Sequence, residues 1–310
     1  MGSPVTVNIL VTGITGYIGS LVAERMARDG HHVRGFARRP ERVTQQLPVI
    51  KGDAVSGEGL EVALDGIDVA YFLIHSMEPA AGDPFASRER ASAENFARAA
   101  GAAGVKRVVY LGGLLPSGGP RSPHVSSRLA VEQILLEAIP QSVALRASIV
   151  IGARSRSFRF LVRLVERLPV LAVPAWRTNC TAPIDERDMV EILARAADSD
   201  EVAGAALDAG GPEVVSYSEL IDRIADLMLV NRPAVRFNRL KVTPIASRIA
   251  AVIAGEEHEL IGPLMESLDS DLLPRDDRAA RLLAVRLHTL NSAIEHALAQ
   301  WEHVEPLGAR

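Results

Sequence analysis

A glycine-rich turn near the start of the chain restricts its fold more than any other part of the sequence. The apolar run Val7–Val11 precedes Gly13, Gly16 and Gly19, and a helical pattern follows over 17–28. After a strand and before a helix, such glycines permit a tight turn, close approach of the backbone to a pyrophosphate, and packing of the helix on the strand. The sequence therefore predicts a Rossmann-type unit that binds a dinucleotide at the helix N-terminus.

Short strand-like runs alternate with longer helical patterns along the first half of the chain. Strands are expected at 7–11, 32–37, 49–51, 69–74, 107–111 and 143–147, with a helix over 85–103 that Gly104 ends. This alternation is typical of a parallel sheet covered by helices on both faces. The predicted fold class is α/β, a doubly wound Rossmann sheet over residues 1–152 that is completed by its sixth strand at 143–147.

The alternation becomes less regular after Gly152. Residues 153–310 are expected to form a smaller C-terminal cap region with closing helices, which covers the cofactor and contributes in part to the core. Helices are predicted near 157–168, 185–198, 216–229 and 257–269, and helical periodicity predicts a closing helix over 278–300. No low-complexity linker separates the two regions, so we expect one continuous interface between them.

Charge and cysteine content exclude several classes of protein. The 34 basic and 38 acidic residues give a net charge of −4, which provides no strong field for nucleic acid or an anionic membrane. No membrane-spanning segment or signal peptide is predicted. The single cysteine, Cys180, is expected to be buried and inert, and no Cys/His spacing indicates a metal site. We expect a cytoplasmic protein whose partner is a small-molecule substrate or another protein, and the sequence is compatible with an oligomer.

The end of the second strand indicates which dinucleotide is bound. An Asp or Glu at this place would hydrogen-bond a ribose 2′-hydroxyl and repel a 2′-phosphate. The strand instead runs into Arg38 and Arg39, whose guanidinium groups can bind a phosphate dianion through two parallel hydrogen bonds. Solvated surface arginines are the alternative interpretation. The sequence thus favours NADP(H) over NAD(H).

Several phrases beyond the glycine turn carry a family resemblance. They are Gly52-Asp53 after the third strand, Gly66-Ile67-Asp68 before the fourth, and the runs 71–77, 104–114 and 145–152. From about residue 6 to about 275 the chain resembles the extended and atypical short-chain dehydrogenases, and more narrowly their NmrA-like, NAD(P)H-binding branch. The resemblance is specific for the family and much less specific for the reaction.

The resemblance and the sheet-edge argument together give a set of cofactor-binding residues. Asp53 matches the family's adenine-contacting acid; the alternative is that it is a turn residue. Ser148 lies in the loop after the sixth strand, which in the family passes close to the nicotinamide; the alternative is a buried serine bonded to backbone. The predicted cofactor-binding residues are Thr12, Gly13, Thr15, Gly16, Tyr17, Ile18, Gly19, Arg38, Arg39, Asp53, Ala54, Ile74, His75, Arg128 and Ser148.

Two places depart from the pattern of active short-chain dehydrogenases. Glycines 112 and 113 stand where the family usually has a catalytic serine, and His124 and Arg128 stand where it has its Tyr-x-x-x-Lys pair. With Ser122 as N-cap and Pro123 as first helical residue, the spacing of four puts both side chains on one helix face. Arg128 stays cationic and can hold a ribose or phosphate, whereas His124 can donate a proton near pH 7. His124 and Arg128 are the candidate catalytic residues. The alternative is that His124 caps or lines the nicotinamide pocket without taking part in the chemistry.

Two functions are consistent with these residues. One is an NADPH-dependent oxidoreductase that reduces a small carbonyl, enone or quinone-type substrate with hydride from the cofactor. The other is a non-catalytic NADP(H)-sensing regulatory or assembly protein, as some NmrA-like proteins are, because the Ser-Tyr-Lys set is missing. A nucleotide-sugar epimerase or dehydratase is disfavoured, since that chemistry relies on the absent tyrosine.

Overall fold

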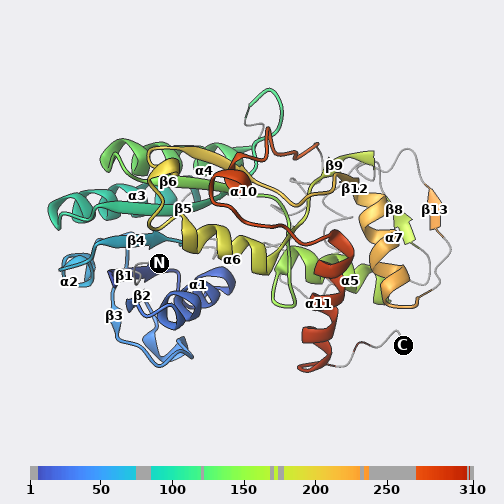
Figure 1. Ribbon diagram of the computed structural model, residues 1–310, viewed down its shortest axis with the longest axis horizontal. Coiled ribbons are helices and arrows are strands. Elements are labelled where there is room, and N and C mark those ends of the chain that lie inside the picture. Colours follow the sequence, from blue (N-terminus) through green and yellow to red (C-terminus); the bar gives the residue numbers. More distant parts are fainter. Residues whose placement is uncertain are drawn as a thin grey trace.

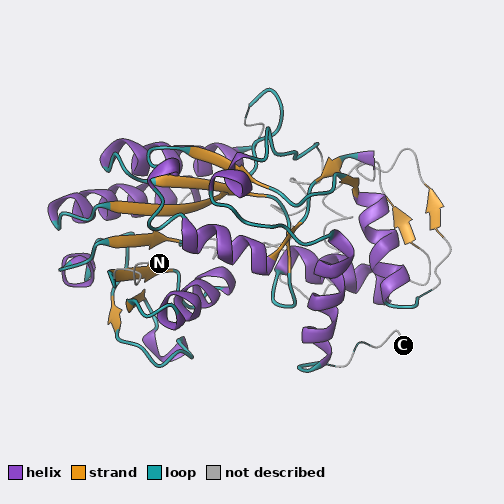
Figure 2. Cartoon of the chain, viewed as in Figure 1, coloured by secondary structure: helices purple, strands orange, loops and turns teal. Residues whose placement is uncertain are grey.

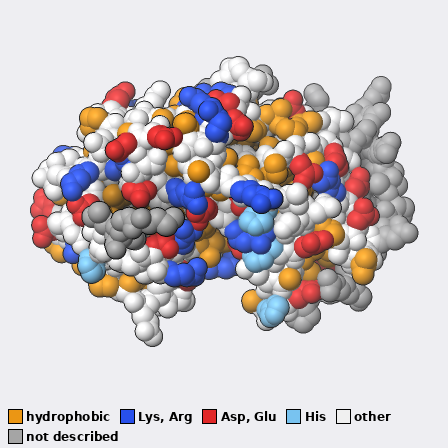
Figure 3. All heavy atoms as spheres, in the orientation of Figure 1, with side chains coloured by type: hydrophobic (Ala, Val, Ile, Leu, Met, Phe, Trp, Pro, Cys, Tyr) orange, Lys and Arg blue, Asp and Glu red, His pale blue; other side chains and the backbone are white. Residues whose placement is uncertain are grey.

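The computed structural model describes residues 6–74, 85–119, 122–167, 171–173, 178–230, 234–236, 270–305 and 307. In these ranges the chain forms a larger lobe built on a parallel sheet and a smaller, mainly helical lobe beside it (Figures 1 and 2). Lys and Arg side chains gather over the middle of the face seen in Figure 3, above a hollow at the lower edge where the two lobes meet.

The sheet has seven parallel strands in the order β3-β2-β1-β4-β5-β6-β11. Their bounds are β1 Asn8–Thr12, β2 His32–Ala37, β3 Val49–Lys51, β4 Val69–Phe72, β5 Arg107–Gly113, β6 Val143–Ala147 and β11 Ala206–Ala209. The order reverses between β1 and β4, which is where open α/β sheets bind ligands at the carboxyl ends of the strands. The predicted doubly wound Rossmann sheet is confirmed.

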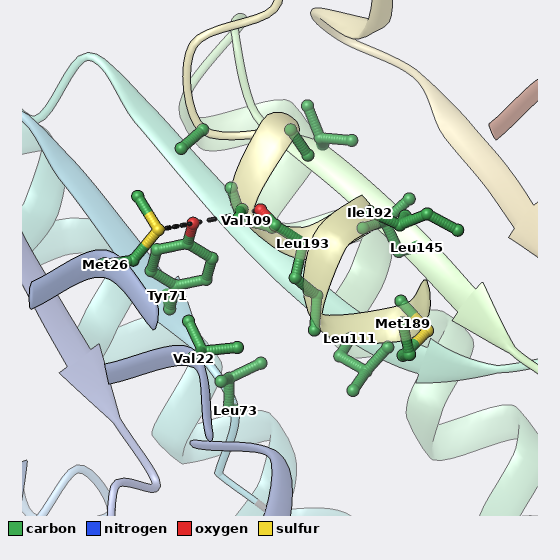
Figure 4. Packing of buried hydrophobic residues seen from close by; sticks show 14 of the residues in the cluster. Val22, Met26, Tyr71, Leu73, Val109, Leu111, Leu145, Met189, Ile192 and Leu193 are labelled. Atoms are coloured by element: carbon green, nitrogen blue, oxygen red, sulfur yellow. Dashed lines mark hydrogen bonds between the residues drawn. The ribbon is translucent and has the colours of Figure 1, made fainter. Parts of the chain in front are cut away.

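One face of the sheet is covered by α1 (Tyr17–Arg28), α6 (Glu186–Arg195) and the short α10 (Arg278–Leu282). Alternate strand residues point to this face, as the pleat of a strand requires, and pack against Val22 and Met26 of α1 and Leu193 of α6 (Figure 4). The buried Tyr71 hydroxyl donates a 3.0 Å hydrogen bond to the carbonyl oxygen of Leu193. This contact ties α6 to the centre of the sheet.

The opposite face carries α2 (Leu60–Leu64), α3 (Phe85–Ala102) and α4 (Pro123–Ala138). The intervening strand residues pack there with the apolar stripes of these helices, and the rings of Phe72 and Phe96 lie 4.9 Å apart. Gly104 ends α3 as predicted, with a φ of +74° that favours glycine.

The smaller lobe packs α5 (Arg156–Arg167), α7 (Tyr217–Leu227) and α11 (Leu290–Glu302) around one apolar cluster. Short strand pairs edge this lobe: β7 (Val150–Ile151) with β10 (Ile184–Asp185), β9 (Cys180–Thr181) with β12 (Val215–Ser216), and β8 (Leu171–Val173) with β13 (Ala234–Arg236). The described ranges also include the 3-10 turns η1 (Pro40–Arg42) and η3 (Asp200–Val202). No helix in the described ranges is long and apolar enough to cross a membrane.

Three expectations were wrong. The sixth strand does not complete the sheet, because β11 pairs with β6 from within the region expected as a cap. The single helix expected over 278–300 is two helices, α10 and α11, separated where Ala284 takes a φ of +50°. Cys180 is half-buried rather than buried, although burial and the nearby carboxylate of Asp271 raise the pKa of its thiol. The helix expected at 257–269 lies outside the described residues.

Candidate cofactor site

The glycine turn connects β1 to α1 at the reversal point of the sheet. Gly13 has a φ of +68°, and a Cβ added to it would lie 2.3 Å from the carbonyl oxygen of Leu73. A Cβ on Gly19 would lie 2.3 Å from the carbonyl oxygen of Gly13, whose oxygen also accepts a 2.8 Å hydrogen bond from the amide of Gly16. The turn therefore has no room for a side chain at its first or third glycine.

The start of α1 is open to an anion. Gly16 is the N-cap and supplies no side-chain hydrogen bond to the first turn, which also holds no acidic residue. Thr15 and Gly16 are exposed, and Ile18 is half-buried. The first amides of a helix carry a positive partial charge and lack intrahelical partners, so this turn has the geometry that binds a pyrophosphate.

Thr12 holds the two central strands together at the site. Its fully buried hydroxyl donates to the carbonyl oxygen of Tyr71 at 2.9 Å and accepts from the amide of Leu73 at 3.2 Å. The side chain of Thr12 thus fixes the carboxyl ends of β1 and β4 relative to each other. Ile74 follows Leu73 and is half-buried; His75, the next predicted residue, lies outside the described residues.

Arg38 and Arg39 lie exposed directly after β2. Strand β2 pairs with β1 up to Thr12 and Phe36, so the two arginines leave the sheet beside the glycine turn. Both residues therefore lie at the carboxyl edge of the sheet, just beyond the end of β2, which is the neighbour of β1.

Asp53 forms a turn of its own at this edge. One carboxylate oxygen accepts a 2.9 Å hydrogen bond from the amide of Val55, which is the turn role that the sequence left as the alternative. Ala54 is buried, and Asn95 of α3 donates to the carbonyl oxygens of Ala54 and Val55 at 3.2 and 2.8 Å. Asn95 was missed from the sequence, because its partners lie about forty positions away.

Helix α4 begins as predicted, with Ser122 accepting a 3.2 Å hydrogen bond from the amide of Val125 and Pro123 in the first turn. His124 is half-buried in that turn. Arg128 is buried, and its Nη2 lies 3.2 Å from Oε1 of the buried Glu89 on α3, whose other oxygen accepts from Ser127 at 2.7 Å. Burial lowers the pKa of Arg128 to about 9, so its guanidinium stays charged at neutral pH.

Glu89 thus gives Arg128 a protein partner that the sequence did not reveal. The roles predicted for Arg128 and His124 toward a cofactor and substrate stay predictions. Ser148 is also buried, and its hydroxyl lies 3.0 Å from that of Thr181. Ser148 is therefore bonded to another hydroxyl within the protein.

Tyr17 links the glycine turn to α6 and to the adjoining part of the smaller lobe. Its hydroxyl donates a hydrogen bond to Glu186 at the start of α6, and burial beside that carboxylate raises the pKa of Tyr17. His296 of α11 lies 3.7 Å from the other oxygen of Glu186. Gly152 packs so closely that a Cβ there would lie 1.9 Å from the Tyr17 hydroxyl. No local sequence pattern indicated Glu186 as part of this site.

Comparison with known proteins agrees with this geometry. Residues 13–148 match the family model described as NAD(P)H-binding. A 3 beta-hydroxysteroid dehydrogenase/Delta 5-->4-isomerase of Mycobacterium tuberculosis is 33% identical over 112 residues, covering 33% of this chain and 30% of that protein. A (4-alkanoyl-5-oxo-2,5-dihydrofuran-3-yl)methyl phosphate reductase of Streptomyces griseus is 42% identical over 106 residues, 33% of each chain. The chain thus spans about a third of the length of these curated relatives.

The fold has a close counterpart among solved structures. A short-chain dehydrogenase/reductase superfamily protein from Agrobacterium tumefaciens, solved with bound NAD, superimposes with a TM-score of 0.70 at 19% identity, covering 96% of this chain and 98% of the other. The glycine turn, the parallel sheet and the matched stretch lead to one conclusion: residues 13–148 match an NAD(P)H-binding domain, and the chain shares its fold with a short-chain dehydrogenase/reductase superfamily protein.

Proposed function

We propose that this protein is an NADPH-dependent reductase of a small carbonyl, enone or quinone-type substrate. The observation that carries the proposal is the exposed pair Arg38-Arg39, which leaves β2 beside the glycine turn at the place where an acid would select NAD(H). The reduction is supported by the two relatives above, one named a dehydrogenase and the other a reductase. Membership of the NmrA-like branch is part of the same proposal.

The cofactor preference gives the first test. Replacing Arg38 or Arg39 by alanine should weaken NADPH binding about tenfold, because a charge-assisted hydrogen bond to the 2′-phosphate is lost, and should leave NADH binding unchanged. Isothermal titration with both cofactors measures this difference. Arg42→Ala is the matched control, since Arg42 is exposed on the same connection. NADH binding as tight as NADPH in the native protein would contradict the preference.

A second test concerns the proton that the reduced substrate must receive. His124 lies in the first turn of α4, the helix that carries the proton donor in active relatives by the resemblance above. If His124 is the general acid, His124→Gln should lower kcat about 10²-fold or more and leave the Kd for NADPH unchanged. NADPH oxidation followed at 340 nm against a panel of quinones, enones and small carbonyl compounds measures turnover.

Ser126→Ala is the control for His124, because Ser126 is exposed on the same helix and bonds only the carbonyl oxygen of Ser122 among its described contacts. Unchanged turnover in His124→Gln would remove His124 as the acid. Tight NADPH binding by the native protein without turnover of any compound would contradict the reductase and favour the cofactor-sensing alternative.

A further inference from the structure

An exposed arginine of the smaller lobe contacts the helix that follows the glycine turn. Arg154 comes shortly after β7, and its Nη1 donates a 3.1 Å hydrogen bond to the hydroxyl of Ser20. Ser20 in turn donates to the carbonyl oxygen of Tyr17 at 2.8 Å. The guanidinium is also near enough to the Tyr17 hydroxyl to oppose the rise of its pKa. Every described contact of Arg154 is therefore with the first turns of α1.

The loop that carries Arg154 is fixed at this place. Gly152 lies against both Tyr17 and Glu186, where a Cβ would be 1.9 Å from one side chain and 2.2 Å from the other. The amide of Ser155 donates to the carbonyl oxygen of Gly152 at 3.0 Å, which closes a turn around residue 154. Arg154 is thus presented on a tight turn two residues from the contact with Tyr17.

The glycine turn itself contains no positively charged side chain. Residues 12–20 contain no Lys or Arg, and the buried carboxylate of Glu186 lies against Tyr17 at the first helical position. A pyrophosphate that arrives here brings further negative charge near that carboxylate. The positive partial charge of the helix N-terminus is only about half an elementary charge. A nearby guanidinium would balance the negative charge of the pyrophosphate that the helix leaves uncompensated.

We infer that Arg154 is a binding residue for the cofactor pyrophosphate, reaching the glycine turn from the smaller lobe; this inference deepens the proposed function and rests on it. A guanidinium has five N–H donors, and Ser20 accepts from one of them. The residue is exposed, so it can keep the bond to Ser20 while other N–H groups contact a phosphate oxygen. Ser20 then orients the arginine, and the smaller lobe contributes to holding the dinucleotide.

The test compares ligands that share or lack a pyrophosphate. In Arg154→Ala, the Kd values for NADPH, NADH and ADP-ribose should each rise about tenfold, as loss of a charge-assisted hydrogen bond implies. The Kd for adenosine 2′-monophosphate, which has no pyrophosphate, should stay within about twofold of the native value. Arg154→Lys keeps the positive charge but loses the paired N–H donors of the guanidinium. Its Kd values for the three pyrophosphate ligands should lie between those of the native protein and those of Arg154→Ala. Isothermal titration of the full chain gives all four values.

Two further variants separate binding from folding. Arg156→Ala removes an exposed arginine two positions away and should leave every Kd within about twofold. Ser20→Ala removes the partner that orients Arg154 but keeps the charge, so the loss for NADPH should be smaller, about two- to threefold. The thermal midpoint of each variant without ligand shows whether it is folded.

The outcomes are distinguishable from those of the proposed function. A Kd for NADPH in Arg154→Ala that stays within about twofold of native, or an equal loss for adenosine 2′-monophosphate, would overturn the role of Arg154. Arg38→Ala has the opposite pattern, with losses for NADPH and adenosine 2′-monophosphate but not for NADH. If the native protein binds no dinucleotide, both proposals are overturned; if it binds NADH best, only the NADPH preference is.

Discussion

Gly19→Ala should weaken NADPH binding about a hundredfold, because the added methyl group would lie 2.3 Å from the carbonyl oxygen of Gly13 and 2.8 Å from its carbonyl carbon. Both contacts are with backbone, so the turn itself must move to relieve them. Forcing extra atoms into a filled space costs about 1–3 kcal/mol, and about 1.4 kcal/mol corresponds to tenfold in affinity. The displaced amides of α1 would no longer converge on a pyrophosphate. Quenching of tryptophan fluorescence or isothermal titration with NADPH measures the loss.

The same substitution elsewhere in the sheet domain provides the control. Gly101 lies in α3, and a Cβ added to it meets nothing within 4 Å. Gly101→Ala should bind NADPH like the native protein and raise the free energy of unfolding by about 0.5–1 kcal/mol, since alanine loses less backbone entropy in a helix. NADPH binding by Gly19→Ala within about threefold of Gly101→Ala would show that the turn is adaptable, against the steric argument.

The elements that the sequence predicts well are those with local signals. The glycine turn, β2 at His32–Ala37 and α1 at Tyr17–Arg28 have the predicted bounds, because turn chemistry and hydrophobic period are properties of neighbouring residues. Strand β11 has no such signal. Its sequence, Ala206–Ala209, contains no β-branched or aromatic residue, and only pairing with β6 makes it a strand.

Tertiary contacts explain why the closing helix is interrupted. The apolar period runs on across residues 283–289, but Arg195 of α6 donates 2.9 Å hydrogen bonds to the carbonyl oxygens of both Leu283 and Ala284. His288 binds the buried carboxylate of Asp188, with Nδ1 at 2.6 Å from Oδ1. These partners lie 88 to 100 positions away along the chain. A helical pattern in the sequence cannot show that its carbonyl groups have competing donors.

The candidate site shows the same division between local and distant information. The sequence indicates the phosphate turn and the arginines after β2 because they lie at fixed offsets from strand ends. It cannot indicate that Glu89 faces Arg128, or that Glu186 faces Tyr17, since each pair joins separate helices or lobes. These two carboxylates are the residues that change how the candidate site is understood. They neutralise or position side chains that the sequence assigned to the cofactor.

The largest expected effect on stability comes from Arg146 of β6, which lies in a buried ionic cluster. Its guanidinium donates two hydrogen bonds to Glu132 of α4, the Nε bond being 2.8 Å, and Nη1 lies 3.6 Å from Asp208 of β11. The three side chains are exposed by only 8%, 6% and 4%. Arg146→Met should lower the free energy of unfolding by about 3–5 kcal/mol, because the carboxylate of Glu132 is left buried without a partner. Urea denaturation followed by circular dichroism measures the loss.

Two further variants identify the uncompensated charge as the cause. Arg146→Met combined with Glu132→Leu removes the buried carboxylate as well, and should recover most of the lost stability, since well-packed apolar residues can replace a buried ion pair. Asp208 keeps its bidentate partner Arg275, at 2.8 Å from each carboxylate oxygen, in both variants.

Arg278→Met is the surface control, because it breaks an ion pair with Asp276 in which the arginine is 48% and the aspartate 36% exposed. It should change the free energy of unfolding by less than about 0.5 kcal/mol. If the double variant is no more stable than Arg146→Met alone, lost packing rather than a stranded charge explains the effect. A loss in Arg146→Met as small as that in Arg278→Met would instead show that solvent reaches Glu132 and that the cluster does not hold α4 to the sheet.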